Sequence, residues 1–134
     1  MGSAIECFAG ATAAVVPRAR VVPIKTTSDL FALRSDACTV TKDATVALAY
    51  AQAPLVRLDD AHYKLVDQID ALVAASPSLK DSFALTVVGA VRFEAGAVVK
   101  GEVTLRNAAP GPVAVREQAF EDVGVDVGAG GAAQ

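Results

Sequence analysis

The chain has 134 residues, of which 53% are hydrophobic and 20% are charged, and its formal net charge is −3. This length suits one compact domain with a modest core, and the apolar residues are too scattered for the run of ~18–20 that a membrane helix needs. The 12 basic residues are dispersed, which argues against the clustered basic face of a nucleic-acid-binding protein.

The first predicted element is the end of a helix over residues 2–11. Ala4, Ile5 and Phe8 fall on one face of it, and Gly10 is placed to end it. Glu6 interrupts the apolar run early, and no basic segment precedes it, so we expect no secretory signal peptide in this sequence.

An extended segment is predicted next, over residues 15–24. Its end, Val21-Val22-Pro23-Ile24, has the β-branched and apolar residues of a short buried strand. Pro17 and Pro23 limit the segment to an edge or broken strand. Pro23 also favours an extended Val22, so a helix cannot begin before Lys25.

A helix is predicted from about Ser28 to Ser35. Thr26, Thr27 and Ser28 can each cap it, and Asp29 lies in the first turn, where an acidic residue is favoured.

Lys25 therefore stands between a strand end and a helix N-terminus, where its ammonium and the free helix N–H groups can hold an anion. Ligands of open α/β sheets bind at the carboxyl ends of strands. Arg18, Arg20 and Lys25 form the only local basic cluster in the sequence, which fits a phosphate or another acidic ligand. The alternative is that all three are ordinary solvated surface charges.

The middle of the chain predicts short strands and one long helix. Residues 36–54 are ambiguous, with short strands suggested around Val40, Val46 and Leu48, and residues 54–58 form another short strand. Asp59 and Asp60 are a helix-capping pattern. The clearest helix follows over residues 61–75, with a narrow apolar stripe, and residues 76–78 end it.

From Phe83 onwards apolar residues and glycines alternate with polar residues over about twenty positions, which is the period of a β-strand. The run is too long for one strand of ~5–6 residues, so we expect bends at Gly89, Gly96 and Gly101. Short strands that keep one face inward predict a β-helix or a small β-roll. Residues 113–127 add a further coil, and residues 128–134 are predicted to be a flexible tail.

The residues that most often carry metal or nucleophilic chemistry are few. Cys7 and Cys38 lack the spacing of a zinc site, and with no secretory signal we expect both to be free thiols in a reducing compartment. We predict neither as a nucleophile. His62 has no obvious partner and suits a surface or capping role, so no metal ligands are predicted.

The stretch V-P-R-A-R-V-V-P-I-K-T-T-S-D-L (residues 16–30) resembles the eukaryotic UTP–glucose-1-phosphate uridylyltransferases, also called UDP-glucose pyrophosphorylases. Their pattern is V-P-R-x-R-F-x-P-V-K-T-T-S-D-L, and the chain departs from it only by apolar exchanges at Val21 and Ile24. Residues 1–8 are similar to the family's G-A/S-A-I-x-x-F helix. We therefore expect the chain to begin inside a longer protein.

A second stretch, residues 85–105, is similar to the family pattern L-x-V-x-G-D-V-x-F-G-x-x-V-x-L-K-G-x-V-x-I. It departs at Ala90, where the family has Asp, and at Glu94, where it often has Gly. The resemblance implies the end of a Rossmann-like α/β nucleotidyltransferase domain over residues 1–80. A small left-handed β-helix over residues 81–127 and the tail over residues 128–134 would follow it.

The resemblance also implies an activity. Family members transfer a uridylyl group from UTP to glucose 1-phosphate with Mg²⁺, by in-line attack of a phosphate oxygen. Lys25 is implied as the catalytic phosphate contact. The implied supporting residues are Thr26, Thr27, Ser28, Asp29, Arg18 and Arg20.

The family's glycine-rich loop K-L-N-G-G-L-G-T-x-M-G has no counterpart in this chain, nor does any other glycine-rich phosphate cradle before Lys25. The expectation is a C-terminal part that is inactive alone. Its partners would be a missing N-terminal catalytic part, UTP, glucose 1-phosphate and proteins that contact the β-helix. The expected location is the cytoplasm. Alternatively the chain is a structural or interaction module derived from the enzyme, which uses the β-helix for assembly.

Overall fold

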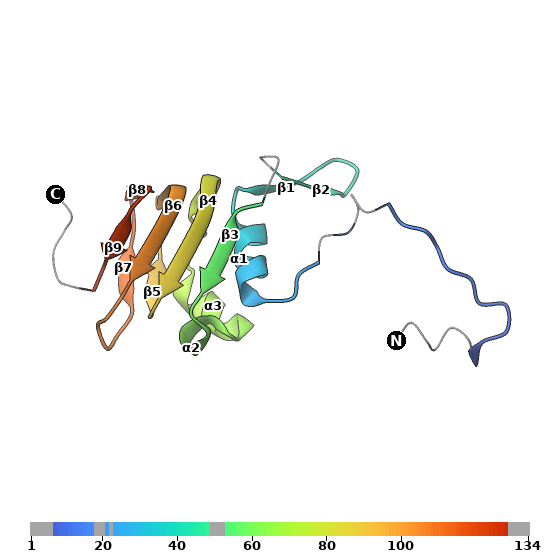
Figure 1. Cartoon of the computed structure of the whole chain (residues 1–134), viewed down its shortest axis with the longest axis horizontal. Helices are drawn as coiled ribbons and strands as arrows, with labels where there is room; N and C mark the ends of the chain where they lie inside the picture. Colours follow the sequence, from blue (N-terminus) through green and yellow to red (C-terminus); the bar gives the residue numbers. More distant parts are fainter. Residues whose placement is uncertain (1–6, 18–20, 22, 49–52, 129–134) are drawn as a thin grey trace.

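A computed structural model describes residues 7–17, 21, 23–48 and 53–128 (Figure 1). Residues 7–17 lie away from the packed body of the molecule, so most of the described contacts come from residues 23–128. Residues 2–6 of the predicted helix over residues 2–11 fall outside the described residues. Residues 8–11 are a turn and irregular chain and not α-helix, so the prediction is wrong for that part. No helix in the described part of the chain is long and apolar enough to cross a bilayer.

A parallel sheet forms the centre of the fold. Its strands run in chain order: β3 (Leu55–Leu58), β4 (Ser78–Val88), β6 (Val98–Arg106) and β8 (Ala119–Glu121). β9 (Gly124–Asp126) also pairs with β6, but further along that strand than β8 does. Every pairing in this sheet is parallel, so each strand returns in the same direction as the one before.

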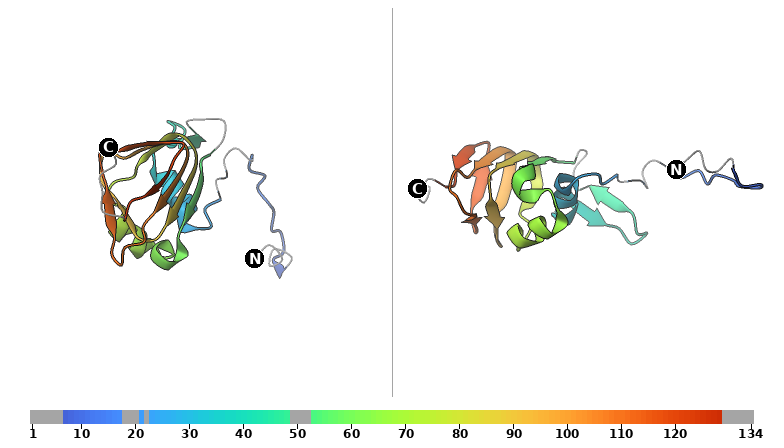
Figure 2. Two further views of the ribbon diagram at one scale, coloured as in Figure 1. Left: turned by 60° about the vertical axis from the view of Figure 1, so that its left-hand side comes forward. Right: turned by 90° about the horizontal axis from the view of Figure 1, so that it is seen from below.

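A second small sheet pairs β5 (Val91–Phe93) with β7 (Val113–Val115), again in parallel. In the main sheet Leu85 lies beside Val103, and Leu105 lies beside Val125, so one coil takes 18 to 20 residues. Figure 2 shows the strands curling round so that successive coils stack along one axis. The predicted coils of short parallel strands are present. The left-handed β-helix is still a prediction, which the parallel pairing of these strands supports.

The alternating residues of these strands build the core, as the period-2 pattern predicts. Leu85, Val87, Val91, Phe93, Val99, Val103 and Leu105 are all at most 2% exposed. Phe83 is the exception, at 81% exposed. The register of β4 against β6 shifts between Ser82 and Ala84, so Ser82 takes the inward position and Phe83 faces solvent.

Two of the glycines expected at bends, Gly89 and Gly96, do lie between strands and have positive φ angles of 80° and 84°. Gly101, with φ 65°, instead lies inside β6. A Cβ at position 101 would come within 1.9 Å of Asp122 Oδ1, so the Asp122 carboxylate would have to move, and the positive φ itself favours glycine there.

The predicted single helix over residues 61–75 is wrong: the structure has α2 (Asp60–Tyr63) and α3 (Val66–Leu72). Leu65 between them is extended, and its N–H donates to Gln68 Oε1 (2.9 Å). The break turns Tyr63 into the core, where it is fully buried and its hydroxyl bonds the backbone of Val91. The tertiary contact overrides the helical pattern of the local sequence.

Other elements follow expectation closely. α1 (Thr27–Arg34) occupies the predicted helix, and β1 (Cys38–Val40) and β2 (Val46–Leu48) form a hairpin within the ambiguous region. By contrast, Val21 and residues 23–25 are not in a strand, and Val21 and Ile24 are 45% and 42% exposed. A strand needs a neighbour to hydrogen-bond, and none of the described strands pairs with this segment.

The core continues across the predicted boundary at residue 80. The ring of Phe31 in α1 packs edge-on against Phe93 in β5, with centroids 5.2 Å apart. β3 pairs with β4, and β4 itself begins at Ser78. The division into residues 1–80, 81–127 and 128–134 stays a prediction, and residues 129–134 lie outside the described part of the chain.

Candidate phosphate-contact site

The candidate site is the loop that leads into α1. Lys25 and Thr26 are exposed, whereas Thr27 and Ser28 are half-buried against the body of the protein. Thr26 is the N-cap residue and has the extended backbone of that position. The sequence prediction of a lysine directly before a capped helix is therefore confirmed for the local structure.

A capping box closes the start of α1. Thr26 Oγ1 accepts from the N–H of Asp29 (3.2 Å), and Asp29 Oδ2 accepts from the N–H of Thr26 (2.8 Å). The same Oδ2 also accepts from the N–H of Lys25 (3.0 Å) and from the hydroxyl of Thr26 (2.9 Å). The donors next to Lys25 therefore already have an acceptor within the chain.

These bonds set the charge state of Asp29. The hydrogen bond from the Lys25 backbone and then those from Thr26 lower the pKa of the Asp29 carboxyl, with a smaller contribution from the Lys25 charge. The carboxylate is thus ionised at neutral pH and balances the positive end of the helix.

Contacts distant in sequence hold α1 in place at both ends. Ser28 Oγ accepts from the N–H of Leu58 at the end of β3 (3.1 Å). At the other end, Arg34 forms an ion pair with Asp70 of α3 (2.6 Å). The Lys25 loop is therefore tied to the sheet through Ser28, although the strand expected before it is absent from the described residues.

A surface cleft of about 270 Å³ lies beside this loop. Its lining is mainly apolar and comes from the segment before Lys25, from α1, from the β1–β2 hairpin and from β3; it includes Pro23, Ile24, Ser28, Asp29, Leu33, Cys38, Leu48 and Leu55. Burial raises the pKa of the Cys38 thiol at this cleft, so the thiol stays protonated and weakly nucleophilic at neutral pH. Cys7 and Cys38 are both free.

Two predicted site residues, Arg18 and Arg20, lie outside the described residues. Lys25, Thr26, Thr27, Ser28 and Asp29 are brought together by the loop and the first turn of α1. The contact between Ser28 and Leu58 could not be found from the sequence, because it joins residues 30 positions apart without any local pattern.

Asp36 is a further residue that the sequence did not single out. Its carboxylate accepts from Ser78 Oγ (2.5 Å) and from the N–H groups of Leu79 (2.7 Å) and Lys80 (3.1 Å). It thereby fixes the turn after α1 to the beginning of β4. No sequence pattern distinguishes this aspartate from a solvated one.

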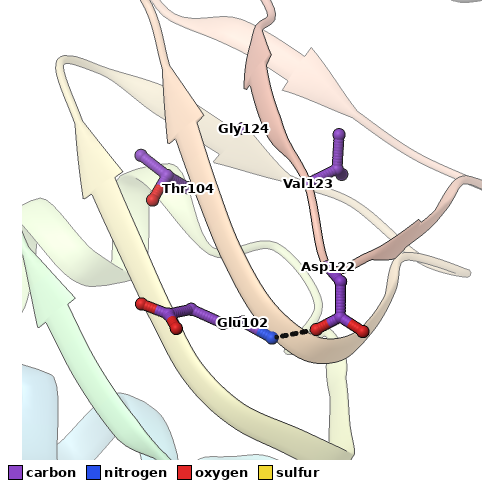
Figure 3. Close-up of a pocket in the computed structure, with 5 residues that line it drawn as sticks. All are labelled: Glu102, Thr104, Asp122, Val123 and Gly124. Carbon is purple, nitrogen blue, oxygen red and sulfur yellow. Dashed lines mark hydrogen bonds between the residues drawn. The ribbon is translucent and has the colours of Figure 1, made fainter.

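A second cavity, of about 350 Å³, is open and polar and lies between β6 and β9 (Figure 3). Asp122 faces it, but the Asp122 carboxylate already accepts from the N–H of Glu102 (2.9 Å). Across the described residues no group of three or more His, Cys, Asp or Glu side chains could hold a metal ion. Lys25 and its loop therefore remain the strongest candidate for chemistry.

Comparison with known proteins gives a consistent result. The family model described as UTP–glucose-1-phosphate uridylyltransferase matches residues 1–100. A UTP–glucose-1-phosphate uridylyltransferase 2 of Dictyostelium discoideum is 36% identical over 107 residues, which are 78% of this chain and 21% of the relative. The enzyme of Solanum tuberosum is 36% identical over 108 residues, which are 78% of this chain and 22% of the relative.

Solved structures agree with these sequence matches. The UDP-glucose pyrophosphorylase of Leishmania major superposes with a TM-score of 0.77 at 41% identity, over 92% of this chain and 27% of that chain. A Trypanosoma brucei structure, titled UDP-glucose phosphorylase, gives a TM-score of 0.77 at 40% identity, over 93% and 28% of the two chains. The chain thus spans about a fifth of the length of the curated relatives it matches.

Proposed function

Because the chain belongs to the UTP–glucose-1-phosphate uridylyltransferase family, we propose that it is the C-terminal part of such an enzyme and is inactive alone. The whole enzyme converts UTP and glucose 1-phosphate into UDP-glucose and pyrophosphate. The observation that carries the proposal is the exposed Lys25 at a capped helix start, within the part of the chain that matches the family.

Lys25 contacts a substrate phosphate in this proposal. In-line attack of a phosphate oxygen on the α-phosphorus brings two anions together, so a cation beside them lowers the barrier. Thr26, Thr27, Ser28 and Asp29 support the loop that carries this cation, and the bonds of Thr26, Ser28 and Asp29 favour that role. Arg18 and Arg20, which precede Lys25 by seven and five positions in the sequence, are proposed to support the same site.

Mg²⁺ is the metal that the family resemblance implies. The described residues offer no cluster of ligands for it. We therefore assign the metal ligands, the uridine pocket and the glycine-rich loop to the missing N-terminal catalytic part.

Parallel coils of 18 to 20 residues support a small left-handed β-helix after the α/β part.

The two free cysteines fit a reducing compartment, in line with a cytoplasmic enzyme.

The test compares the 134-residue chain with the longer polypeptide that contains it. UDP-glucose formation is measured from UTP and glucose 1-phosphate. We expect turnover from the longer protein and none from the chain alone. Turnover by the isolated chain would show that the catalytic parts are present in it.

Lys25→Ala in the longer protein should lower kcat by at least about 100-fold, because the transition state loses a charge contact. Circular dichroism and the melting temperature should be unchanged, since Lys25 is exposed. Lys42→Ala, in the turn between β1 and β2, is the matched control and should keep full activity. Unchanged turnover of Lys25→Ala would remove Lys25 from the site.

A second function, assembly through the coils, is favoured by one observation. Phe83 (81% exposed) and Leu55 (53% exposed) line a surface hollow on β3 and β4, together with Ala53, Ser82 and Ala84. An exposed phenylalanine beside a leucine suits a protein contact. In the longer protein, Phe83→Glu should then shift the oligomeric state in sedimentation experiments while UDP-glucose synthesis is retained. Phe83→Leu should leave the oligomeric state unchanged.

A further inference from the structure

The N-terminus of α1 already holds an anion from its own chain. Asp29 Oδ2 accepts from the N–H groups of Lys25 and Thr26 and from the Thr26 hydroxyl, at 2.8 to 3.0 Å. From the sequence, the Lys25 ammonium and the free N–H groups of the helix were expected to hold a substrate anion. The N–H groups of Lys25 and Thr26, just before the helix, donate to Asp29.

This arrangement separates the backbone of Lys25 from its side chain. The backbone N–H of Lys25 is fixed by a carboxylate four residues later, while the residue itself is exposed. Ser28, one position before Asp29, ties the same turn to β3 through the N–H of Leu58. The backbone of Lys25 is thus tied to Asp29, and the turn that carries Asp29 is tied to β3.

We propose that Asp29 is a positioning residue for Lys25: it holds the Lys25 and Thr26 amides, so that the Lys25 ammonium, and not these two amides, contacts the substrate phosphate. The proposal rests on the proposed function and deepens it. A carboxylate near a phosphate site is repulsive unless its charge is met, and here the capping N–H groups and the positive end of α1 meet it.

A double-mutant cycle in the longer protein tests this role. Asp29→Ala should lower kcat by about 10- to 100-fold, since small misplacements of a catalytic group cost that much. In a Lys25→Ala background the same change should alter kcat by less than about 2-fold, because Asp29 acts through Lys25. Independent, multiplying losses would overturn the proposal.

Two control variants separate positioning from simple loss of stability. Asp29→Asn keeps a carbonyl oxygen that can accept the same N–H groups, so it should recover most of the kcat lost in Asp29→Ala. Arg34→Ala removes the ion pair at the other end of α1, so it loosens the same helix without touching Lys25. It should lower the melting temperature and leave kcat unchanged; a loss of kcat equal to that of Asp29→Ala would overturn the proposal.

The amide ¹H–¹⁵N resonances of Lys25 and Thr26 in the 134-residue chain provide a measurement without activity. Both should move markedly in Asp29→Ala and stay close to wild type in Asp29→Asn. Unchanged amides in Asp29→Ala overturn the positioning proposal alone. If Lys25→Ala leaves turnover of the longer protein unchanged, the proposed role of Lys25 fails, and the positioning proposal fails with it.

Discussion

Tyr63 is the side chain that most clearly links the helical and the coiled parts of the molecule. It is fully buried, its hydroxyl donates to the carbonyl of Val91, and the N–H of Val91 donates back to it (3.0 Å). Desolvation raises the pKa of Tyr63 to about 12, since the buried phenolate would lose its hydration. One hydroxyl thus satisfies both backbone groups of the first residue of β5.

Tyr63→Phe should lower the free energy of unfolding by about 1–3 kcal/mol, because it leaves two buried backbone groups without a partner. Urea denaturation followed by circular dichroism measures this loss. Tyr50, the other tyrosine, lies outside the described residues. The control is therefore Phe31→Leu, which changes the shape of a side chain without polar groups. A loss no larger than in the control would show that the hydrogen bonds contribute little.

The same tyrosine predicts a pH dependence. The pKa of Tyr63 is higher in the folded than in the unfolded protein, so its contribution to folding is complete below the ordinary tyrosine pKa of about 10 and is lost as pH rises to about 12. Stability should therefore fall between about pH 10 and 12, and Tyr63→Phe should flatten that part of the curve. An unaltered slope in the variant would assign the dependence to other groups.

At the scale of elements, close approach decides where glycine is required. At Gly89, φ is +80°, and a Cβ would lie 2.1 Å from the carbonyl oxygen of Asn107. A Cβ added to Gly124 in β9 would meet open space, and the φ of Gly124 is not in the left-handed region. The turn after β4 can pass the end of β6 only without a side chain.

Gly89→Ala should therefore destabilise the protein by about 3 kcal/mol or more, from backbone strain together with the displaced carbonyl. Gly124→Ala should change stability by less than about 0.5 kcal/mol. Thermal unfolding of the two variants side by side measures the contrast. Equal melting temperatures would mean that the turn relaxes at little cost.

The sequence predicted those elements whose determinants are local. The α1 cap depends on Thr26 and Asp29, three residues apart, and the period-2 pattern identified the buried face of β6. The helix break at Leu65 was missed because Tyr63 is drawn to Val91, and the outward turn of Phe83 was missed because it follows a register shift against β6. Tertiary contacts decided both.

The candidate site also has features that the local sequence predicts and features that depend on tertiary contacts. Lys25 and its cap were predictable, whereas the bonds of Ser28 to Leu58 and of Asp36 to Ser78 join distant parts of the chain. The strand expected before Lys25 is not seen among the described residues of that segment, and none of the described strands pairs with them. The proposed reaction came from the resemblance to a family and not from a local pattern.

For the molecule as a whole, one core serves the helices and the coils. Phe31 is 1% exposed and packs on Phe93, so the segment with Lys25 and the segment with the coils share buried surface. The two predicted domains should then unfold together, even though residue 80 separates their sequence patterns.

Phe31→Ala should cost about 3–5 kcal/mol, as for other large core truncations. Amide exchange should rise together in α1 and in β6, as in a single cooperative transition. Leu65→Ala, at a 61% exposed position, is the control and should have little effect. Exchange that rises in α1 alone would instead favour independent units divided near residue 80.

The chain order of the main sheet has a further consequence, for synthesis. β4 pairs with β3, β6 with β4, and β8 and β9 with β6, so each strand of this sheet after β3 joins a strand that was translated before it. Within this sheet, no strand after β3 has to wait for its first partner. The coils can therefore be laid down one after another as the polypeptide leaves the ribosome, each using the previous one as its template.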